Sequence, residues 1–151
     1  MRRKETNKME IKDYPADAIT TPENIASIIQ AILKREATID QDKEHFWTIG
    51  LDTANRIKYI ELVTLGILNS TLIHPREVFR LAVMQGVATI ILVHNHPSGN
   101  LKPSEGDQTI TQNLIEAGKI LAIKVMDHIL IGKDWKPGYN NYYSWKEEEM
   151  I

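Results

Sequence analysis

Three residues between positions 94 and 107 have the types and spacing needed to bind a metal ion. His94 and His96 stand two positions apart at the end of an apolar run, and Asp107 follows a turn-forming segment. Side chains two apart in a strand point to the same face, so both imidazoles can approach one ion at about 2.0–2.1 Å. Asp107 would supply a third ligand if the turn brings it back. Three protein ligands leave a fourth tetrahedral position for water, which is typical of catalytic zinc.

Each of these residues also has a purely structural interpretation. The chain contains five histidines, so a spacing of two can arise by chance. Asp107 stands three positions after Ser104, where an acidic side chain completes a helix capping box and interacts favourably with the helix dipole. Taken together, at the end of the strand predicted to be most buried, the residues favour a metal site. Asp107 can fill both roles.

The sequence before this group predicts one helix and a hairpin. Thr21 can cap a helix that begins at Pro22, and Ile and Leu residues then recur at helical spacing. Two runs rich in β-branched and aromatic residues follow and predict paired strands. The elements expected here are a loop at 34–44, strands at 45–51 and 57–63 joined by a turn at 52–55, and a short strand or extended link at 67–72.

The elements around the candidate ligands follow from apolar runs and helix signals. The unbroken apolar run from Ala88 to Val93 predicts a central strand that is covered on both faces. A helix should begin at Ser104 and end near Gly118. The other elements expected are a helix from 75 that ends before 86, strands at 121–125 and 128–131, and a loop with a short final strand after 133.

Length, charge and composition limit the class of protein. With 151 residues we expect one domain at 20–151 and a flexible segment at 1–19. The absence of cysteine excludes disulfides, thiolate-bound zinc and iron–sulfur clusters. A net charge of −2 disfavours direct DNA binding. Because no apolar run is long enough to span a membrane and no secretory signal is visible, we expect a cytoplasmic protein without a membrane partner. The oligomeric state stays open, a dimer included.

The spacing of the candidate ligands resembles a known motif. His94-x-His96, seven residues, Ser104, two residues and Asp107 is similar to the JAMM (MPN-type) metalloprotease motif. The surrounding sequence resembles the bacterial RadC family from about Thr21 to Trp145. The segments that carry this likeness are His-Asn-His-Pro-Ser-Gly at 94–99, Pro-Arg-Glu-Val at 75–78 and Asp-His at 127–128. The resemblance is to a short form, because longer RadC proteins carry an N-terminal helix–hairpin–helix module for which this length leaves no room.

The resemblance implies a fold and a cofactor. The fold would be α/β of the α+β type, a single JAMM/MPN-like domain with a mixed, curved sheet flanked by helices and a cytidine-deaminase-like topology. The cofactor would be Zn²⁺, held by His94, His96 and Asp107. The partner would be a peptide or protein substrate.

Two catalytic residues are also implied by the resemblance. JAMM proteins use a glutamate at the start of an early strand, and Glu44 is the best match in this chain. Such a general base must lie within hydrogen-bond reach of the attacking water. Glu61, on the returning strand, is its rival. Ser104 would stabilise the oxyanion, or would serve only as a helix N-cap.

Two functions from different classes are consistent with these residues. The leading one is a zinc metallopeptidase or isopeptidase that uses a water on zinc and a glutamate base. The alternative is a non-proteolytic DNA-repair or mobile-element accessory protein of the RadC type. The letters His-Asn-His at 94–96 do not indicate an HNH nuclease, in which these residues are spread far apart. A zinc nucleobase deaminase is excluded because it requires cysteine ligands.

Several further residues have mainly structural interpretations. His74 precedes Pro75 and would cap a helix. His128 is expected to be a buried core histidine, with support of a metal ligand as the alternative. The three tryptophans, Trp47, Trp135 and Trp145, are expected in the core.

Overall fold

The computed structural model describes residues 9–12, 14, 20–66, 73–133 and 141–151. These residues form one six-stranded sheet in the order β1-β3-β2-β4-β5-β6. The strands are β1 (Met9–Ile11), β2 (Glu44–Leu51), β3 (Ile57–Gly66), β4 (Thr89–Asn95), β5 (Lys124–Ile131) and β6 (Tyr142–Ser144). Only β4 and β5 are parallel, and every other neighbouring pair is antiparallel. The sheet is mixed, as expected for a JAMM/MPN-like domain.

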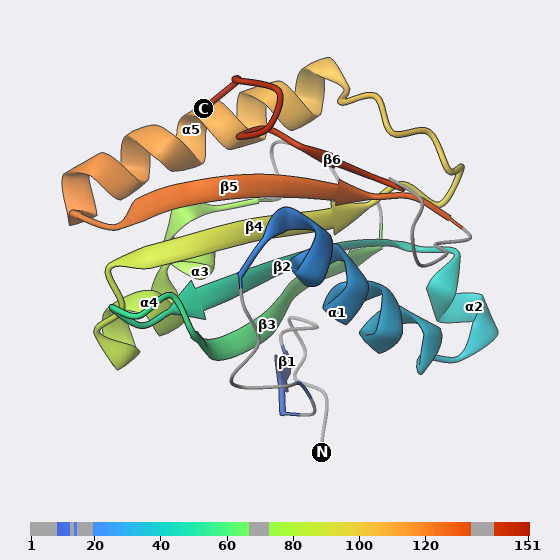
Figure 1. Cartoon of the computed structure of the whole chain (residues 1–151), viewed down its shortest axis with the longest axis horizontal. Coiled ribbons are helices and arrows are strands. Elements are labelled where there is room, and N and C mark those ends of the chain that lie inside the picture. Colours follow the sequence, from blue (N-terminus) through green and yellow to red (C-terminus); the bar gives the residue numbers. More distant parts are fainter. Residues whose placement is uncertain (1–8, 13, 15–19, 67–72, 134–140) are drawn as a thin grey trace.

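Five helices lie around this sheet within the described part of the chain. They are α1 (Pro22–Lys34), α2 (Thr38–Gln41), α3 (Pro75–Val78), α4 (Arg80–Gln85) and α5 (Glu105–Leu121). Figure 1 shows α1 crossing in front of the sheet and α5 running along β5. None of the helices searched, all of them in the described ranges, has the length and apolar character needed to cross a bilayer.

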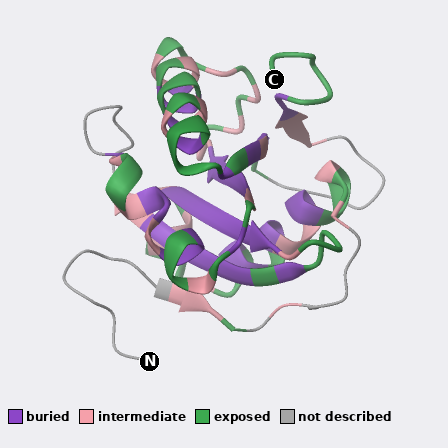
Figure 2. Ribbon diagram, turned by 90° about the vertical axis from the view of Figure 1, so that its left-hand side faces the viewer, coloured by how far each residue is buried: buried purple, intermediate pink, exposed green. Residues whose placement is uncertain are grey.

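Alternating side chains divide the sheet into two buried faces. On one face, residues such as Trp47, Ile91 and Val93 pack against the apolar side of α1. On the other face, residues such as Phe46 and Leu92 pack against α3, α4 and α5. Figure 2 shows the central strands buried between these layers, while the helices expose their outer sides. Both faces of β4 are therefore covered, which explains its unbroken apolar sequence.

Two helix starts agree with the sequence. The Thr21 hydroxyl accepts a hydrogen bond from Asn24 N at 3.2 Å, and Pro22 occupies the first helical position of α1. Ser104 and Asp107 form a reciprocal capping box at the start of α5. Such caps satisfy backbone N–H groups that have no partner inside the helix. The capping box also fixes the position of the Asp107 side chain.

The prediction of two strands at 121–125 and 128–131 is wrong, because β5 is one continuous strand. Leu121 belongs to α5, which ends at Ala122 in the left-handed conformation. Asp127 suggested an interruption, but it is buried and accepts bonds from Ser144 Oγ and Lys146 N. A buried carboxylate with such partners is tolerated inside a strand.

The predicted end of α5 near Gly118 is also wrong, since the helix continues to Leu121. Gly118 is buried, and a Cβ atom there would lie 2.4 Å from the Ile123 carbonyl oxygen. The glycine therefore permits close packing at the turn into β5 rather than ending the helix.

Three smaller features differ from the expected elements. The stretch expected as a loop at 34–44 contains the short helix α2. The helix expected from Pro75 to Gly86 is divided into α3 and α4 at Phe79. The sequence did not predict β1, which pairs with β3 at the edge of the sheet. The strand or link expected at 67–72 and the core position expected for Trp135 lie outside the described residues.

Candidate metal centre

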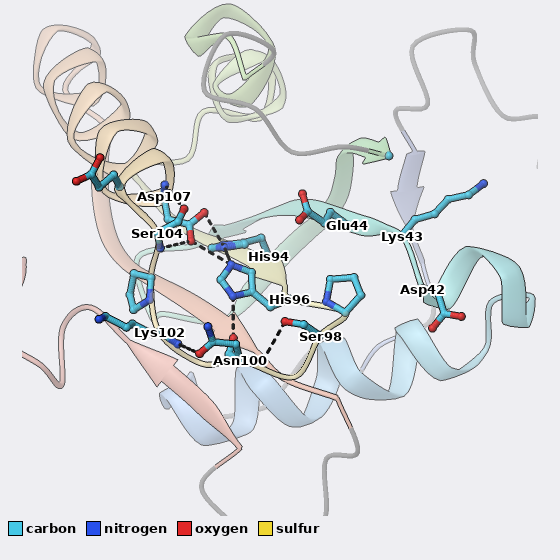
Figure 3. A pocket seen from close by; sticks show the side chains of 14 residues that line it. Asp42, Lys43, Glu44, His94, His96, Ser98, Asn100, Lys102, Ser104 and Asp107 are labelled. Carbon is cyan, nitrogen blue, oxygen red and sulfur yellow. Dashed lines mark hydrogen bonds and ion pairs between the residues drawn. The ribbon is translucent and has the colours of Figure 1, made fainter.

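The structure brings the three predicted ligands together at one end of the sheet. His94 is the second-last residue of β4, His96 follows that strand, and Asp107 lies in the first turn of α5. Each offers one donor atom, and these atoms all lie within 4.8 Å of one another. Figure 3 shows the two imidazoles and the carboxylate pointing toward one another.

The distances between the donor atoms fit a tetrahedral ion. Nε2 of His94 is 3.2 Å from Nε2 of His96 and 3.1 Å from Oδ1 of Asp107. Nε2 of His96 is 3.0 Å from Oδ2 of Asp107. A tetrahedral site with bonds of about 2.0–2.1 Å has ligand-to-ligand edges of roughly 3.3–3.4 Å. A small divalent cation therefore fits among these atoms with only slight outward movement.

The orientation of His96 follows from its other ring nitrogen. Nδ1 lies 2.7 Å from the carbonyl oxygen of Asn100. Because a carbonyl can only accept, Nδ1 carries the proton and donates it. In the neutral ring the lone pair is then on Nε2, the atom that faces Asp107. The loop after β4 thus presents His96 in the tautomer that a metal requires.

The orientation of His94 is fixed by a chain of buried groups that we call the His128 relay, consisting of Asp107 O, Thr111, His128 and His94. The Thr111 hydroxyl donates to the Asp107 carbonyl at 2.7 Å, so its oxygen must accept from Nδ1 of His128, at 2.5 Å. Neutral His128 then has its lone pair on Nε2, which accepts from Nδ1 of His94 at 2.7 Å. This leaves the lone pair of His94 on Nε2, facing the other donors.

The relay is consistent with the charges expected in the buried site. Burial holds the pKa of His128 well below its ordinary value, and the neighbouring His94 adds to this effect. Burial likewise lowers the pKa of His94, against the opposing influence of Asp107. Trp145 stacks on His128 with ring centroids 4.1 Å apart. Both histidines are therefore held neutral, and a neutral imidazole is the form that binds metal.

The pKa values of Asp107 and His96 are shifted in opposite directions. Burial opposes ionisation of Asp107, but hydrogen bonds with His94 and His96 outweigh it and hold the pKa of the carboxyl far below its usual range. Burial also opposes charge on His96, yet the bonds to Asp107 and to the Asn100 carbonyl raise its pKa. Without a cation, a proton on Nε2 of His96 would lie between this nitrogen and Oδ2 of Asp107. A metal ion would replace that proton.

The predicted catalytic residues Glu44 and Ser104 line the same pocket as the three ligands. The pocket has a volume of about 1010 Å³. Glu44 is the first residue of β2 and is half-buried, whereas Ser104 is exposed at the N-cap of α5. Figure 3 shows Glu44 across the pocket from Ser104 and Asp107, with the imidazoles between them. Glu44 also contributes an attractive charge to both His94 and His96.

Glu61, the rival base, lies in the sheet interior rather than in this pocket. Its side chain is 2% exposed, and Oε2 is 2.6 Å from the Arg80 guanidinium. Residues 44, 94, 96, 104 and 107 line the pocket, and Glu61 is absent from its described lining. Glu61 therefore forms an ion pair that joins β3 to α4.

The remaining sequence predictions have mixed outcomes. His74 is at the N-cap of α3, but its side chain makes no capping bond. His128 is fully buried and also contacts a ligand, so the two interpretations of it are compatible. Trp47 and Trp145 are in the core as expected. The structural role of Thr111 was not predicted. A Thr four residues after a candidate ligand was the only available signal for Thr111.

Comparison with known proteins extends these observations. A family model described as RadC-like JAB domain matches residues 19–150. A UPF0758 protein of Desulforudis audaxviator is 46% identical over 114 residues, covering 76% of this chain and 47% of that protein. A UPF0758 protein of Methanosarcina mazei is 39% identical over 139 residues, covering 92% of this chain and 56% of that protein. The chain thus spans about half the length of the curated relatives it matches. The mixed α/β domain, with His94, His96 and Asp107 close together at the end of β4, agrees with this family match. The chain therefore belongs to the RadC-like JAB domain family.

Proposed function

We propose that this domain is a zinc-dependent hydrolase, a metallopeptidase or isopeptidase acting on a peptide or protein substrate. The observation that carries the proposal is the convergence of His94, His96 and Asp107 in a pocket that Glu44 and Ser104 also line. Two imidazoles and one carboxylate are a donor set that zinc accepts, and three protein ligands leave an open position. Structural zinc sites, by contrast, usually have four protein ligands.

The residues of the chain divide the work of amide hydrolysis between them. When bound, zinc supplies a Lewis acid that lowers the pKa of an attacking water and polarises a carbonyl. Glu44 accepts the proton of the attacking water and passes it to the leaving nitrogen. The neutral imidazoles of His94 and His96 and the ionised carboxylate of Asp107 hold the cation. The His128 relay keeps His94 from turning away.

Ser104 can cap α5 and stabilise an oxyanion at the same time. Its Oγ accepts a hydrogen bond from Asp107 N at 3.0 Å, which uses a lone pair. The hydroxyl hydrogen is then available to a group in the pocket. Because Ser104 is exposed there and anchored by its own N–H to Oδ2 of Asp107 at 2.8 Å, it is a fixed donor beside the metal site.

The size and lining of the pocket favour a peptide over a small metabolite. Its volume of about 1010 Å³ is at the upper end of the range for small-molecule sites. Its lining includes charged side chains from two segments, Asp42 and Lys43 just before β2, and Lys102 and Glu105 around the start of α5. Charges of both signs on these two segments suit the polar groups of an extended chain.

The proposal is tested first by metal content and then by turnover. Purified protein is loaded with zinc, dialysed and measured by mass spectrometry, together with the His96→Ala and Asp107→Ala variants. We expect one zinc ion in the parent protein and none in the variants. A parent protein that remains metal-free would contradict the proposal.

Turnover is measured on a library of quenched fluorescent peptides that includes lysine isopeptide linkages. We expect hydrolysis that disappears with 1,10-phenanthroline and returns with added zinc. Glu44→Gln should keep the zinc and lose hydrolysis by a factor of about 10²–10⁴, the usual contribution of a general base. Full turnover by zinc-loaded Glu44→Gln would show that Glu44 is not the base.

A further inference from the structure

Asn95 stands between the two histidines of the candidate metal site but does not face it. It is the last residue of β4 and is 2% exposed. Because side chains alternate along a strand, Asn95 points to the α1 face, opposite to His94. Buried asparagine is uncommon unless its amide is hydrogen-bonded, so the partners of this side chain indicate its role.

Both hydrogen bonds of the Asn95 amide go to the main chain on either side of Glu44. Oδ1 accepts from His45 N at 2.6 Å, and Nδ2 donates to the Lys43 carbonyl at 3.0 Å. The oxygen can only accept and the NH₂ group can only donate, so these partners determine the orientation of the amide. Asn95 thus forms hydrogen bonds with the peptide groups that precede and follow the proposed base.

This contact extends the sheet beyond its last regular pair. The ladder between β2 and β4 ends with Phe46 opposite His94. One residue further, the side chain of Asn95 replaces the backbone in bonding to His45 N. Asn95 itself is fixed on its other side by pairing with Ile131 of β5. The position of β2 at Glu44 is therefore tied to the strand that carries the metal ligands.

A second side chain supports the same peptide group. The Lys43 carbonyl also lies 2.7 Å from Nδ1 of His45, which must donate to it. Nε2 of His45 lies 2.5 Å from Oε2 of Glu36, which follows α1. The Lys43 carbonyl thus has two buried donors, and the segment before Glu44 is held by β4 and by the residue Glu36 that follows α1.

We propose that Asn95 is a positioning residue that sets the place of Glu44 relative to the metal bound by His94 and His96. The inference rests on the proposed function, because it assigns Asn95 to the base of that reaction. Both bonds go to the main chain, so they fix the backbone on either side of Glu44 without involving its carboxylate. The sequence His94-Asn95-His96 then encodes two ligands and the support of the base in three consecutive residues.

The test uses the cobalt(II)-loaded protein and needs no substrate. The visible spectrum of protein-bound cobalt(II) changes with pH when a group bound to the metal loses a proton. A nearby carboxylate opposes this loss of a proton, so it raises the pH at the midpoint of the spectral change. We expect Glu44→Gln to lower the midpoint by about one pH unit. Asn95→Ala should lower it in the same direction, because the carboxylate is no longer held near the ion.

The double variant separates positioning from other effects. If Asn95 acts through Glu44, Asn95→Ala adds no further shift in the Glu44→Gln protein. Gln30→Ala is the matched control, because Gln30 is also a buried amide that donates to a main-chain carbonyl, Gly132 O, at 2.6 Å. Its loss should leave the midpoint unchanged. Should Asn95→Ala fail to fold, Asn95→Asp, which retains the acceptor for His45 N, is measured in the same way and should give a smaller shift.

The possible contrary results point to different errors. A normal midpoint in the Asn95 variants, with a shifted midpoint in Glu44→Gln, overturns the positioning role and leaves the proposed function intact. An additional shift in the double variant overturns it as well, since Asn95 would then act on the metal without Glu44. An unshifted Glu44→Gln protein removes Glu44 from the metal and overturns both assignments. A protein that binds neither cobalt nor zinc overturns the proposed function together with the inference.

Discussion

Nδ1 of His94 lies 2.7 Å from Nε2 of His128, so one buried imidazole is oriented by another. Histidine ligands usually donate their second N–H to a carboxylate, a carbonyl or water. Here the acceptor is a neutral ring whose own tautomer depends on Thr111. A neutral acceptor adds no negative charge to the site, so the charge that would neutralise a bound cation would come mainly from Asp107 and Glu44.

Replacing His128 should weaken metal binding without unfolding the protein. In His128→Leu, Nδ1 of His94 loses its acceptor and the ring can turn, so we expect the zinc affinity to fall about 10–100-fold. His128→Gln can still accept from His94 and should recover part of the loss. Competition with a chromophoric chelator measures the affinities. An unchanged affinity in His128→Leu would contradict the relay.

Substitutions at Ser104 and Asp107 should distinguish the contribution of helix capping from that of metal binding. Ser104→Ala removes one half of the capping box and should lower the free energy of unfolding by about 1 kcal/mol while zinc is retained. Asp107→Ala should lower stability by a similar amount in the metal-free protein and also abolish binding. Urea unfolding of the metal-free proteins and mass spectrometry of the loaded ones provide the two measurements. Loss of zinc from Ser104→Ala would mean that the cap alone positions Asp107.

Metal affinity should decrease as the pH falls. The pKa of His96 is raised above its ordinary value of 6.5, and a bound metal must displace the proton it holds. In the metal-free protein, the raised pKa gives stability that is fully present below about 6.5 and is lost as the pH rises through the folded-state value. The zinc-induced rise in melting temperature should therefore shrink as the pH is lowered through that value. A zinc effect independent of pH across this window would contradict the assignment.

Glu61→Gln should affect stability and leave turnover in place. Glu61 is buried against the part-exposed Arg80, so loss of its charge should lower the free energy of unfolding by about 1–3 kcal/mol. Glu44→Gln should show the reverse pattern, with little change in stability and loss of hydrolysis. Parallel urea unfolding and peptide turnover assays on the two variants distinguish them. Loss of turnover in a folded Glu61→Gln protein would restore Glu61 as the base.

Gly118→Ala should destabilise the protein even though alanine is the better helix former. The added Cβ would lie 2.4 Å from the Ile123 carbonyl oxygen, a backbone atom that cannot move aside easily. We expect a loss of about 1–3 kcal/mol. Gly106→Ala, in the first turn of the same helix, meets only Ser104 Oγ at 3.6 Å and should be neutral or slightly stabilising. Thermal unfolding of both variants checks the difference.

The parts of the structure that sequence could predict are those with local signals. The caps at Thr21 and Ser104 were identified because residue type and position determine such caps directly. The buried β4 was recognisable from its unbroken apolar run. The His94 and His96 pair and Asp107 could be proposed as neighbours because strand alternation and a capping box each restrict where a side chain points.

The parts that sequence could not predict depend on contacts between distant elements. Asp127 interrupts the apolar pattern of β5, and its partners Ser144 and Lys146 are 17 and 19 residues away. A local pattern therefore could not show that a buried carboxylate is tolerated inside this strand. Gly118 suggested a helix end because glycine often follows the last residue of a helix. Its actual role, close packing against the Ile123 carbonyl, depends on the folded structure and cannot be read from a local pattern. The link of His128 to His94 spans 34 residues, and that of Asn95 to Lys43 spans 52. Only the folded sheet shows that these pairs meet.

The capping box of α5 has a consequence for how quickly the site can be filled. Oδ2 of Asp107 accepts from Ser104 N at 2.8 Å and is therefore already immobilised when no cation is present. His96 is restrained by Asn100 and His94 by His128 in the same way. Little side-chain entropy remains to be lost on capture of an ion, so loading should be limited by dehydration of the incoming cation rather than by rearrangement of the protein.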